Sequence, residues 1–268
     1  MNITPVVKQL LIINIIFFIG AQLLTSEVAT HYFALFYYEN PSFKFWQPLT
    51  HMFMHANLMH IFFNMFALYS FGSNLEHFWG GKKFLFFYIS CGLGAAILHT
   101  AVNYFQIHYL LNSISSLKLS SSEINLLINS NLREVFDTNN LMVEGNVKTI
   151  LERVNCNQEQ FNIIADANSI TRTPAVGASG AVYGLLVAFA FMFPTAQLGL
   201  MFIPIPIKAK YFVPGLLVVD LILGLKGSSI FGAGSTGIAH FAHIGGAITG
   251  FIMMWYWKKN EFNKNRWN

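Results

Sequence analysis

Charge is scarce in this sequence. Only 10% of its 268 residues are Asp, Glu, Lys or Arg, whereas 54% are hydrophobic and the mean hydropathy is +0.48. Because soluble domains carry roughly 25% charged residues, the composition excludes an ordinary soluble protein and indicates an integral membrane protein. Cysteine is scarce as well: Cys91 stands in an apolar run and Cys156 in a polar one, which argues against a disulfide framework or a thiolate metal site.

A signal-peptide cleavage site is also lacking after the first apolar run, 10–24, so we expect this run to remain as a transmembrane helix. In all, six apolar segments approach the roughly 20 residues that a membrane-spanning helix needs. We therefore predict an all-α membrane protein that forms a bundle of six transmembrane helices. The segments cover residues 6–24, 56–71, 84–104, 176–193, 211–225 and 238–257.

Basic residues set the expected orientation. If the six helices alternate in direction, most Lys and Arg of the short loops and termini fall on one side, while the opposite loops carry Lys44 and Lys226. The positive-inside rule then places both termini in the cytoplasm and the start of the fourth helix toward the outside. No transit-type leader is evident, so we expect a bacterial inner (plasma) membrane. The residues on the basic side are Lys8, Lys82, Lys83, Lys208, Lys210, Lys258, Lys259, Lys264 and Arg266.

A polar insert, 108–173, separates the third and fourth segments and holds seven of the twelve acidic residues. Within it, residues 121–130 show helical apolar spacing after a serine-rich cap. We expect short amphipathic helices on the extracytoplasmic face, with a flexible solvated loop as the alternative. The expected regions are 1–107 with helices 1–3, this insert, 174–257 with helices 4–6, and a cytoplasmic tail of 258–268.

The expected outer ends of three helices carry polar side chains. The fourth helix begins with the sequence GASGAVYG around Ser179, and the sixth carries His243. On the second helix, His60 and Asn64 lie one turn apart on one face. An unsatisfied polar group in hydrocarbon costs several kcal/mol, so we expect these side chains to share a wet cavity.

Glycines at a spacing of four allow two membrane helices to approach closely, and such an approach would bring Ser179 within hydrogen-bond reach of His243. A serine hydroxyl is a weak nucleophile until a base takes its proton, and a helix start offers free N–H groups to an oxyanion. His60 and Asn64 are neutral donors suited to the same oxyanion. Considered alone, Ser179 is interpreted as a residue that packs between helices, and His243 as a histidine whose hydrogen bonds are satisfied within the bundle. The glycines are Gly180, Gly184, Gly246 and Gly250.

Two other functional classes fit parts of the sequence. Nine histidines invite a metal site, but the H-E-x-x-H signature is absent, and we expect no metal. Asp220 is an intramembrane carboxylate, which suggests a transporter. A transporter would show more ionisable groups along a path and paired broken helices, so we interpret Asp220 as a structural or gate residue.

Taken together, the motifs resemble those of the rhomboid family of intramembrane serine proteases. That family is marked by G-x-S-G-x-x-x-G in the fourth helix, H-x-x-x-N in the second and A-H-x-x-G-x-x-x-G in the sixth. A further similar patch, Gly72-x-x-x-Glu76-x-x-x-Gly80, ends the second helix. The likeness extends over residues 46–104 and 176–257. Its motif residues are Gly177, Ser179, Gly180, Gly184, His60, Asn64, Ala242, His243, Gly246 and Gly250.

The resemblance implies a Ser–His dyad without an acid, with Ser179 as nucleophile and His243 as general base and then acid. It implies an oxyanion site formed by the Ser179 backbone N–H with the His60 and Asn64 side chains. The Tyr183 ring would pack on His243. The implied reaction is cleavage of transmembrane protein substrates near the outer membrane face, without a metal or any other cofactor.

The expected partners are therefore transmembrane substrates and the lipid bilayer, with no nucleic acid, and the insert offers a contact for another protein. The resemblance also implies that substrate access involves movement of the fifth helix and of the loop after it, here 227–236. Gln47 follows Trp46 where many members have arginine, which bears on the anchoring of the first loop. The alternative function is that of an inactive rhomboid-like protein that binds membrane clients. Such proteins typically lack the serine or the histidine, and both are present here.

Overall fold

The computed structural model describes residues 2–132, 134–136, 142–200, 203–226 and 238–260. The expected access loop and most of the expected cytoplasmic tail therefore lie outside the described residues. Within the described part, the chain is mostly helical and divides into two compact units. The first unit consists of Met1–Leu35, Phe45–His99 and Ala175–Asn268, and the second of Phe36–Lys44 and Thr100–Pro174.

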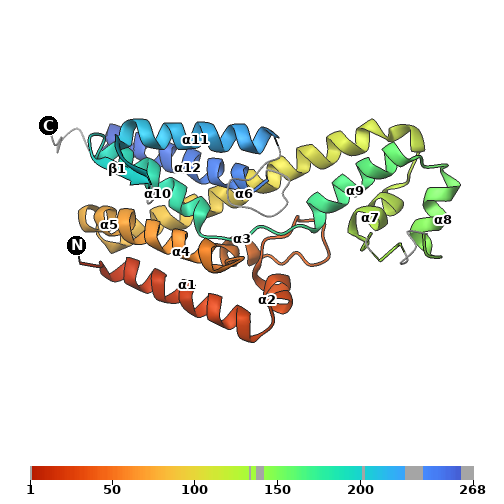
Figure 1. The fold of residues 1–268 in the computed structure, drawn as a ribbon, viewed down its shortest axis with the longest axis horizontal. Helices are drawn as coiled ribbons and strands as arrows, with labels where there is room; N and C mark the ends of the chain where they lie inside the picture. Colours follow the sequence, from red (N-terminus) through yellow and green to blue (C-terminus); the bar gives the residue numbers. More distant parts are fainter. Residues whose placement is uncertain (1, 133, 137–141, 201–202, 227–237, 261–268) are drawn as a thin grey trace. The chain divides into compact units, whose positions relative to one another are not determined.

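Each of the six predicted apolar segments lies largely in a helix, and the first unit contains all of them except residues 100–104 of the third (Figure 1). Its N-terminal elements are α1 (Pro5–Leu23), α2 (Ser26–Phe33), α3 (Gln47–Thr50), the 3-10 turn η1 (His51–Phe53), α4 (Leu58–Ala67), the π-helical turn η2 (Leu68–Gly72) and α5 (Ser73–Trp79). The remaining elements are the first part of α6 (Gly81–Ser113), then α10 (Ser179–Met192), β1 (Gln197–Leu200), β2 (Ile203–Lys208), α11 (Ala209–Lys226) and α12 (Ile238–Asn260).

Two described helices are long and apolar enough to cross a membrane by length and composition. These are α1, with 19 residues, and α6, with 33. The helix α10 is apolar but has only 14 residues. The structure therefore supports a helical protein with two clear candidate spans, and the count of six stays a prediction.

A buried carboxylate at the end of the second segment anchors the start of α1. Gly80, with a φ of +77°, ends α5. One turn earlier, Glu76 accepts hydrogen bonds from the backbone N–H groups of Val6 and Val7 at 2.9 and 2.8 Å, and the Thr4 hydroxyl donates to the same carboxylate. The first N–H groups of a helix have no partner within it and carry partial positive charge. Glu76 satisfies them and so fixes the N-terminus of α1.

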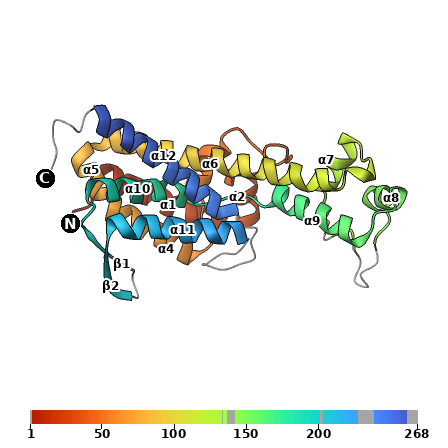
Figure 2. The same ribbon diagram turned by 90° about the horizontal axis from the view of Figure 1, so that it is seen from above.

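Within the part of the chain that the structure describes, the all-α prediction is incorrect at the connection between α10 and α11. Here β1 and β2 pair as an antiparallel hairpin, with Gln197 opposite Lys208. The hairpin extends away from the helices in Figure 2. Pro204 and Pro206 lack the N–H groups that a helix requires, and the alternation Ile-Pro-Ile-Pro-Ile favours an extended strand.

The helices α10 and α12 pack backbone to backbone through their glycines. A methyl group added at Gly246 would meet the Gly180 carbonyl, and one added at Gly250 would lie 2.9 Å from the Cα of Gly184. Contacts this close leave no room for a side chain. They bring the first turn of α10 beside the part of α12 from Ala242 to Gly246. The apolar core around them consists of Val7, Leu10, Met52, Leu68, Leu75, Phe84, Phe87, Tyr88, Cys91, Ala181, Leu185, Ala188 and Met254.

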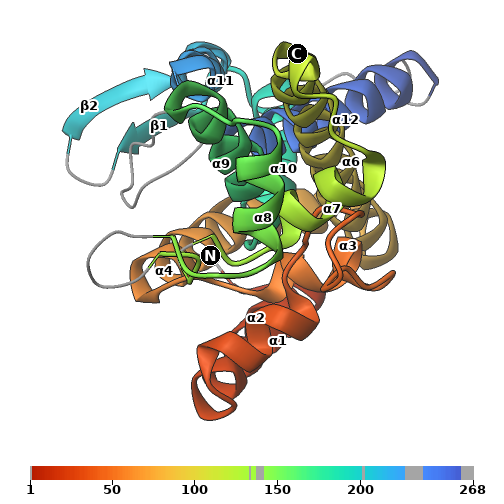
Figure 3. The ribbon, with the colours of Figure 1, turned by 90° about the vertical axis from the view of Figure 1, so that its right-hand side faces the viewer.

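The second unit is helical rather than a solvated loop. It contains the end of α6, η3 (Ser115–Leu117), α7 (Ser121–Asn129), α8 (Asn146–Arg153) and α9 (Gln158–Arg172), and Figure 3 shows α7, α8 and α9 together. The predicted amphipathic helix is α7, which begins with a capping box between Ser120 and Glu123. The Asn168 side chain of α9 donates to the carbonyl oxygens of Leu127 and Ile128. The apolar core of the second unit consists of Ile114, Leu117, Leu127, Val147, Ile150, Leu151 and Ile164.

Candidate active site

Ser179 is the first residue of α10, and a glycine in an uncommon conformation leads into it. Gly177 has a φ of +126°, and a methyl group there would lie 2.8 Å from the His60 ring. Only glycine meets both restrictions without strain. The Gly177 N–H donates to the His51 carbonyl at 2.9 Å, which fixes this turn. The Ser179 hydroxyl therefore lies at a helix start, where backbone N–H groups lack helical partners.

The Ser179 hydroxyl meets the imidazole of His243. Oγ of Ser179 lies 2.8 Å from Nε2 of His243, a distance at which a proton can pass between them. The Tyr183 ring, one turn further along α10, stacks on the His243 ring with centroids 4.3 Å apart and planes 12° apart. This stacking restricts the imidazole, so that Nε2 stays directed at Ser179. Both Ser179 and His243 are partly exposed, as a reacting pair must be.

The predicted oxyanion donors His60 and Asn64 differ in position. The His60 ring faces Gly177, two residues before Ser179. Its Nδ1 accepts a long hydrogen bond, 3.4 Å, from the Ala56 N–H, so Nε2 carries the ring hydrogen and is a neutral donor. The buried Asn64 amide instead donates to the His60 carbonyl at 2.9 Å. Of these two side chains, His60 is therefore better placed to donate to an oxyanion at Ser179.

A carboxylate that the motifs do not include lies behind His243. Asp220, on α11, is 3% exposed, and its Oδ2 lies 2.9 Å from Nδ1 of His243. Its Oδ1 accepts a hydrogen bond from Nδ1 of His240. The expectation of a dyad without an acid did not include this contact, and the interpretation of Asp220 as a structural or gate residue did not name a partner for it. The one available signal was the high cost of an intramembrane carboxylate.

Asp220, His240 and His243 also bring one potential metal-ligand atom each within 4.8 Å of one another. Ligands held at 2.0–2.1 Å around a tetrahedral zinc ion lie about 3.3 Å apart. The 2.9 Å distance between Asp220 and His243 instead fits a direct hydrogen bond. Nε2 of His243 is also engaged by Ser179. The cluster therefore fits a hydrogen-bonded network better than a metal site.

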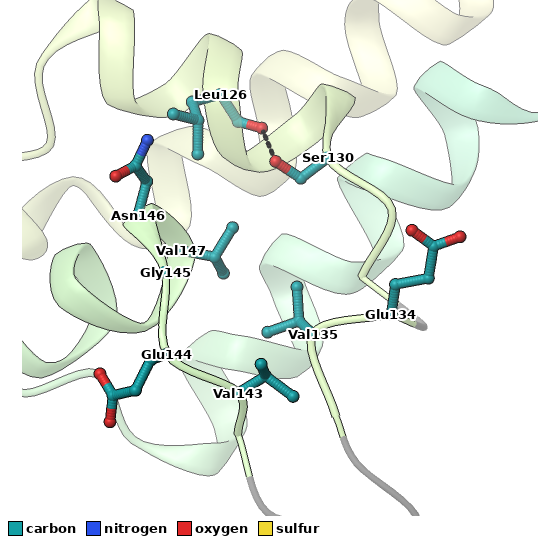
Figure 4. Close-up of a pocket in the computed structure, with 9 residues that line it drawn as sticks. All are labelled: Leu126, Ser130, Glu134, Val135, Val143, Glu144, Gly145, Asn146 and Val147. Carbon is teal, nitrogen blue, oxygen red and sulfur yellow. Dashed lines mark hydrogen bonds between the residues drawn. The ribbon is translucent and has the colours of Figure 1, made fainter.

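A cavity is present in the second unit (Figure 4). This cavity of about 220 Å³ lies between the end of α7 and the start of α8. Its lining includes Ser130, Glu134 and Glu144 but no histidine. The Ser130 hydroxyl donates to the Leu126 carbonyl at 2.6 Å, so it is engaged with its own helix. The cavity therefore lacks the paired nucleophile and base that Ser179 and His243 provide.

Comparisons with known proteins identify the family to which this chain is similar. A model described as the rhomboid domain matches residues 42–111 and 156–260, which include His60, Ser179 and His243. The chain is also 26% identical over 229 residues to an uncharacterized mitochondrial rhomboid protein of Schizosaccharomyces pombe. That match covers 81% of this chain and 53% of the relative, so the chain spans about half of the relative's length. Because the family model matches well over half of the sequence, the chain belongs to the rhomboid family, whose members are integral membrane proteins.

Proposed function

We propose that this chain is an intramembrane serine protease in which Ser179 is the nucleophile and His243 the base. The observation that carries the proposal is the 2.8 Å distance between Oγ of Ser179 and Nε2 of His243 at the start of α10. Membership of the rhomboid family supports the reaction class. The proposed substrates are transmembrane proteins, cut near the outer membrane face, and the reaction needs no cofactor.

The reaction begins when Oγ of Ser179 bonds to the carbonyl carbon of the scissile peptide while Nε2 of His243 takes the hydroxyl proton. The imidazolium then gives this proton to the leaving amine nitrogen as the C–N bond breaks. An acyl-enzyme remains on Ser179. A water molecule next gives a proton to His243 and attacks the ester carbonyl, and the proton returns to Oγ when the acid product leaves.

Negative charge develops on the carbonyl oxygen during both attacks. The proposed donors to this oxyanion are the Ser179 backbone N–H and Nε2–H of His60, with Asn64 as a further donor. One such donor is typically worth about 10²–10³ in rate. The Asn64 amide already donates to the His60 carbonyl, so in this arrangement it also fixes the turn that carries His60.

The proposed architecture for this activity is a six-helix bundle with spans at α1, α4 to α5, α6, α10, α11 and α12. In it, region 1–107 holds the first three spans, 174–257 the last three, and 258–268 is a tail. The insert 108–173 lies on the extracytoplasmic side, where it is available to contact substrates or another protein. Both termini face the cytoplasm in the bacterial plasma membrane that we propose. A mitochondrial relative makes an organellar membrane the alternative.

Replacing the nucleophile tests the function directly. Wild type, Ser179→Ala and a control, Ser130→Ala, are purified and placed in liposomes with a serine-directed fluorophosphonate probe or a model transmembrane substrate. Ser130 is chosen because its hydroxyl donates to the Leu126 carbonyl at the end of α7 and because it lies far along the chain from Ser179. We expect Ser179→Ala to lose both labelling and cleavage by at least about 10³-fold. Ser130→Ala should match wild type.

Full cleavage by folded Ser179→Ala would refute the proposed nucleophile. A folded wild type that neither labels nor cuts any of several transmembrane substrates would instead favour the inactive, client-binding function. Circular dichroism and gel filtration of each variant establish that a lost activity does not reflect lost fold.

A further inference from the structure

Asp220 is a buried carboxylate whose described hydrogen-bond partners all belong to the candidate site. His240 and His243, about one turn apart on α12, direct Nδ1 at its two oxygens. Asp220 is 3% exposed and His240 is 5% exposed. A carboxylate in apolar surroundings is tolerated when donors satisfy its oxygens, and here each oxygen has one histidine donor.

We propose that Asp220 is a positioning residue that holds His243 in the tautomer required for catalysis, and that His240 holds Asp220 in turn. This inference rests on the proposed function of Ser179. An ionised carboxylate can only accept hydrogen bonds, so Nδ1 of His243 carries the hydrogen. Nε2 is then left with its lone pair, and it faces the Ser179 hydroxyl at 2.8 Å. The imidazole is therefore oriented as a base before substrate binds.

The same contact gains importance once the proton has moved. Taking the proton of Ser179 turns His243 into an imidazolium, and the Asp220 carboxylate 2.9 Å from its Nδ1 offsets that charge. Such an interaction is stronger in a poorly solvated bundle than in water. The proton stays on the imidazole and passes to the leaving amine, so no bond to Asp220 forms or breaks.

His240 accounts for the alignment of the carboxylate. Each oxygen of Asp220 is fixed by one histidine, so the carboxylate cannot rotate without breaking a buried hydrogen bond. Because His240 and His243 are three residues apart, α12 presents both rings to the same group on α11. The competing interpretation is a structural tie between α11 and α12. Such a tie uses the same hydrogen bonds but leaves turnover per folded molecule unchanged.

Asp220→Asn distinguishes the two interpretations in the full-length protein in liposomes. Asparagine keeps the shape but can present an N–H to Nδ1 of His243, which favours the wrong tautomer. We expect kcat for a model transmembrane substrate to fall about 10²–10⁴-fold, with KM changed by less than about threefold. Fluorophosphonate labelling of Ser179 should slow in parallel. His240→Gln should lower kcat by about tenfold, and it carries the kinetic test if Asp220→Asn does not fold.

Glu76→Gln is the matched control, because Glu76 is a second buried carboxylate of the same unit and contacts only the start of α1 among its described partners. We expect this variant to have a lower thermal midpoint and a kcat within about twofold of wild type. If Asp220→Asn behaves in the same way, losing stability but keeping kcat per folded molecule, the positioning role is overturned.

A spectroscopic measurement separates this proposal from the proposed function. With 15N-labelled histidine, wild type should show strongly downfield Nδ1 proton resonances for His243 and His240. Both should persist in Ser179→Ala and disappear in Asp220→Asn. A folded wild type without the His243 resonance overturns the role of Asp220 whether or not the protein is active. The resonance in a protein that cuts no substrate would uphold the tautomer and remove the protease function.

Discussion

Different interactions stabilise the two units of this chain internally. In the first unit, α10 and α12 meet at glycines, with Gly246 against the Gly180 carbonyl, and the buried carboxylates Asp220 and Glu76 are enclosed by donors. In the second unit, short helices begin with capping boxes and charged pairs such as Arg153–Glu123 remain accessible. The first unit therefore depends on close backbone packing, whereas the second depends on helix caps and accessible charged pairs.

The difference follows from the surroundings that each unit is expected to meet. Lipid tails are as apolar as leucine, so membrane helices associate through close contact of small residues and through hydrogen bonds between helices. A unit in water gains from burying apolar side chains, and its helix ends gain from side-chain caps. The same kind of substitution should therefore have unequal effects in the two units.

The largest effect is expected where the first unit is packed most closely. Gly246→Val places a branched side chain against the Gly180 backbone, which cannot give way as a side chain can, so we expect a loss of about 3 kcal/mol of stability, the upper end of the usual range for overpacking, or no folded protein. Gly20→Val in α1 is the control, because a methyl group there meets nothing within 4 Å. Thermal midpoints and gel filtration in detergent measure both. A Gly246→Val protein as stable as wild type would contradict the backbone contact.

Much of this packing is foreseeable from local spacing. Glycines four apart lie on one helix face whatever the rest of the chain does, and that is why Gly180 and Gly246 could be paired from the sequence. The cap at Ser120 is equally local, because the capping box involves residues three apart. Single-helix patterns of this kind predicted the helices and the approach of Ser179 to His243.

Other features depend on relations between elements that no local pattern fixes. The contact of Asp220 with His243 depends on the register of α11 against α12, which are separated by residues 227–237. The hairpin was missed because its six-residue strand, Ile203–Lys208, is short and apolar, and so resembles a continuation of the bundle. Its two prolines, Pro204 and Pro206, were the available signal.

A smaller effect is expected from a cap in the second unit. Ser120 accepts a hydrogen bond from the Glu123 backbone N–H at 3.3 Å, and loss of such a cap typically costs about 1 kcal/mol. In Ser120→Ala, amides of α7 should exchange with deuterium about fivefold faster, while labelling of Ser179 stays unchanged. Ser116→Ala, at an exposed serine of η3, is the control. Slower labelling of Ser179 in Ser120→Ala would show that the two units are coupled, which the comparison does not predict.

The smallest effect concerns the charge of Glu123 on the surface of the second unit. The Ser120 N–H and hydroxyl, followed by the Arg153 guanidinium, hold the pKa of the Glu123 carboxyl below its usual range. Since the folded-state pKa is the lower one, this carboxylate stabilises α7 above about pH 4.3, which is the pKa of a glutamate in an unfolded chain. The contribution is lost as pH falls through the folded-state pKa.

An NMR titration of the Glu123 carboxyl should therefore give a depressed pKa in wild type. Ser120→Ala should raise it only in part, because the Ser120 N–H still donates at 2.9 Å. Arg153→Gln should raise it less than that, because an exposed ion pair is largely screened by water. A larger shift in Arg153→Gln than in Ser120→Ala would mean that charge pairing, not capping, holds this helix end.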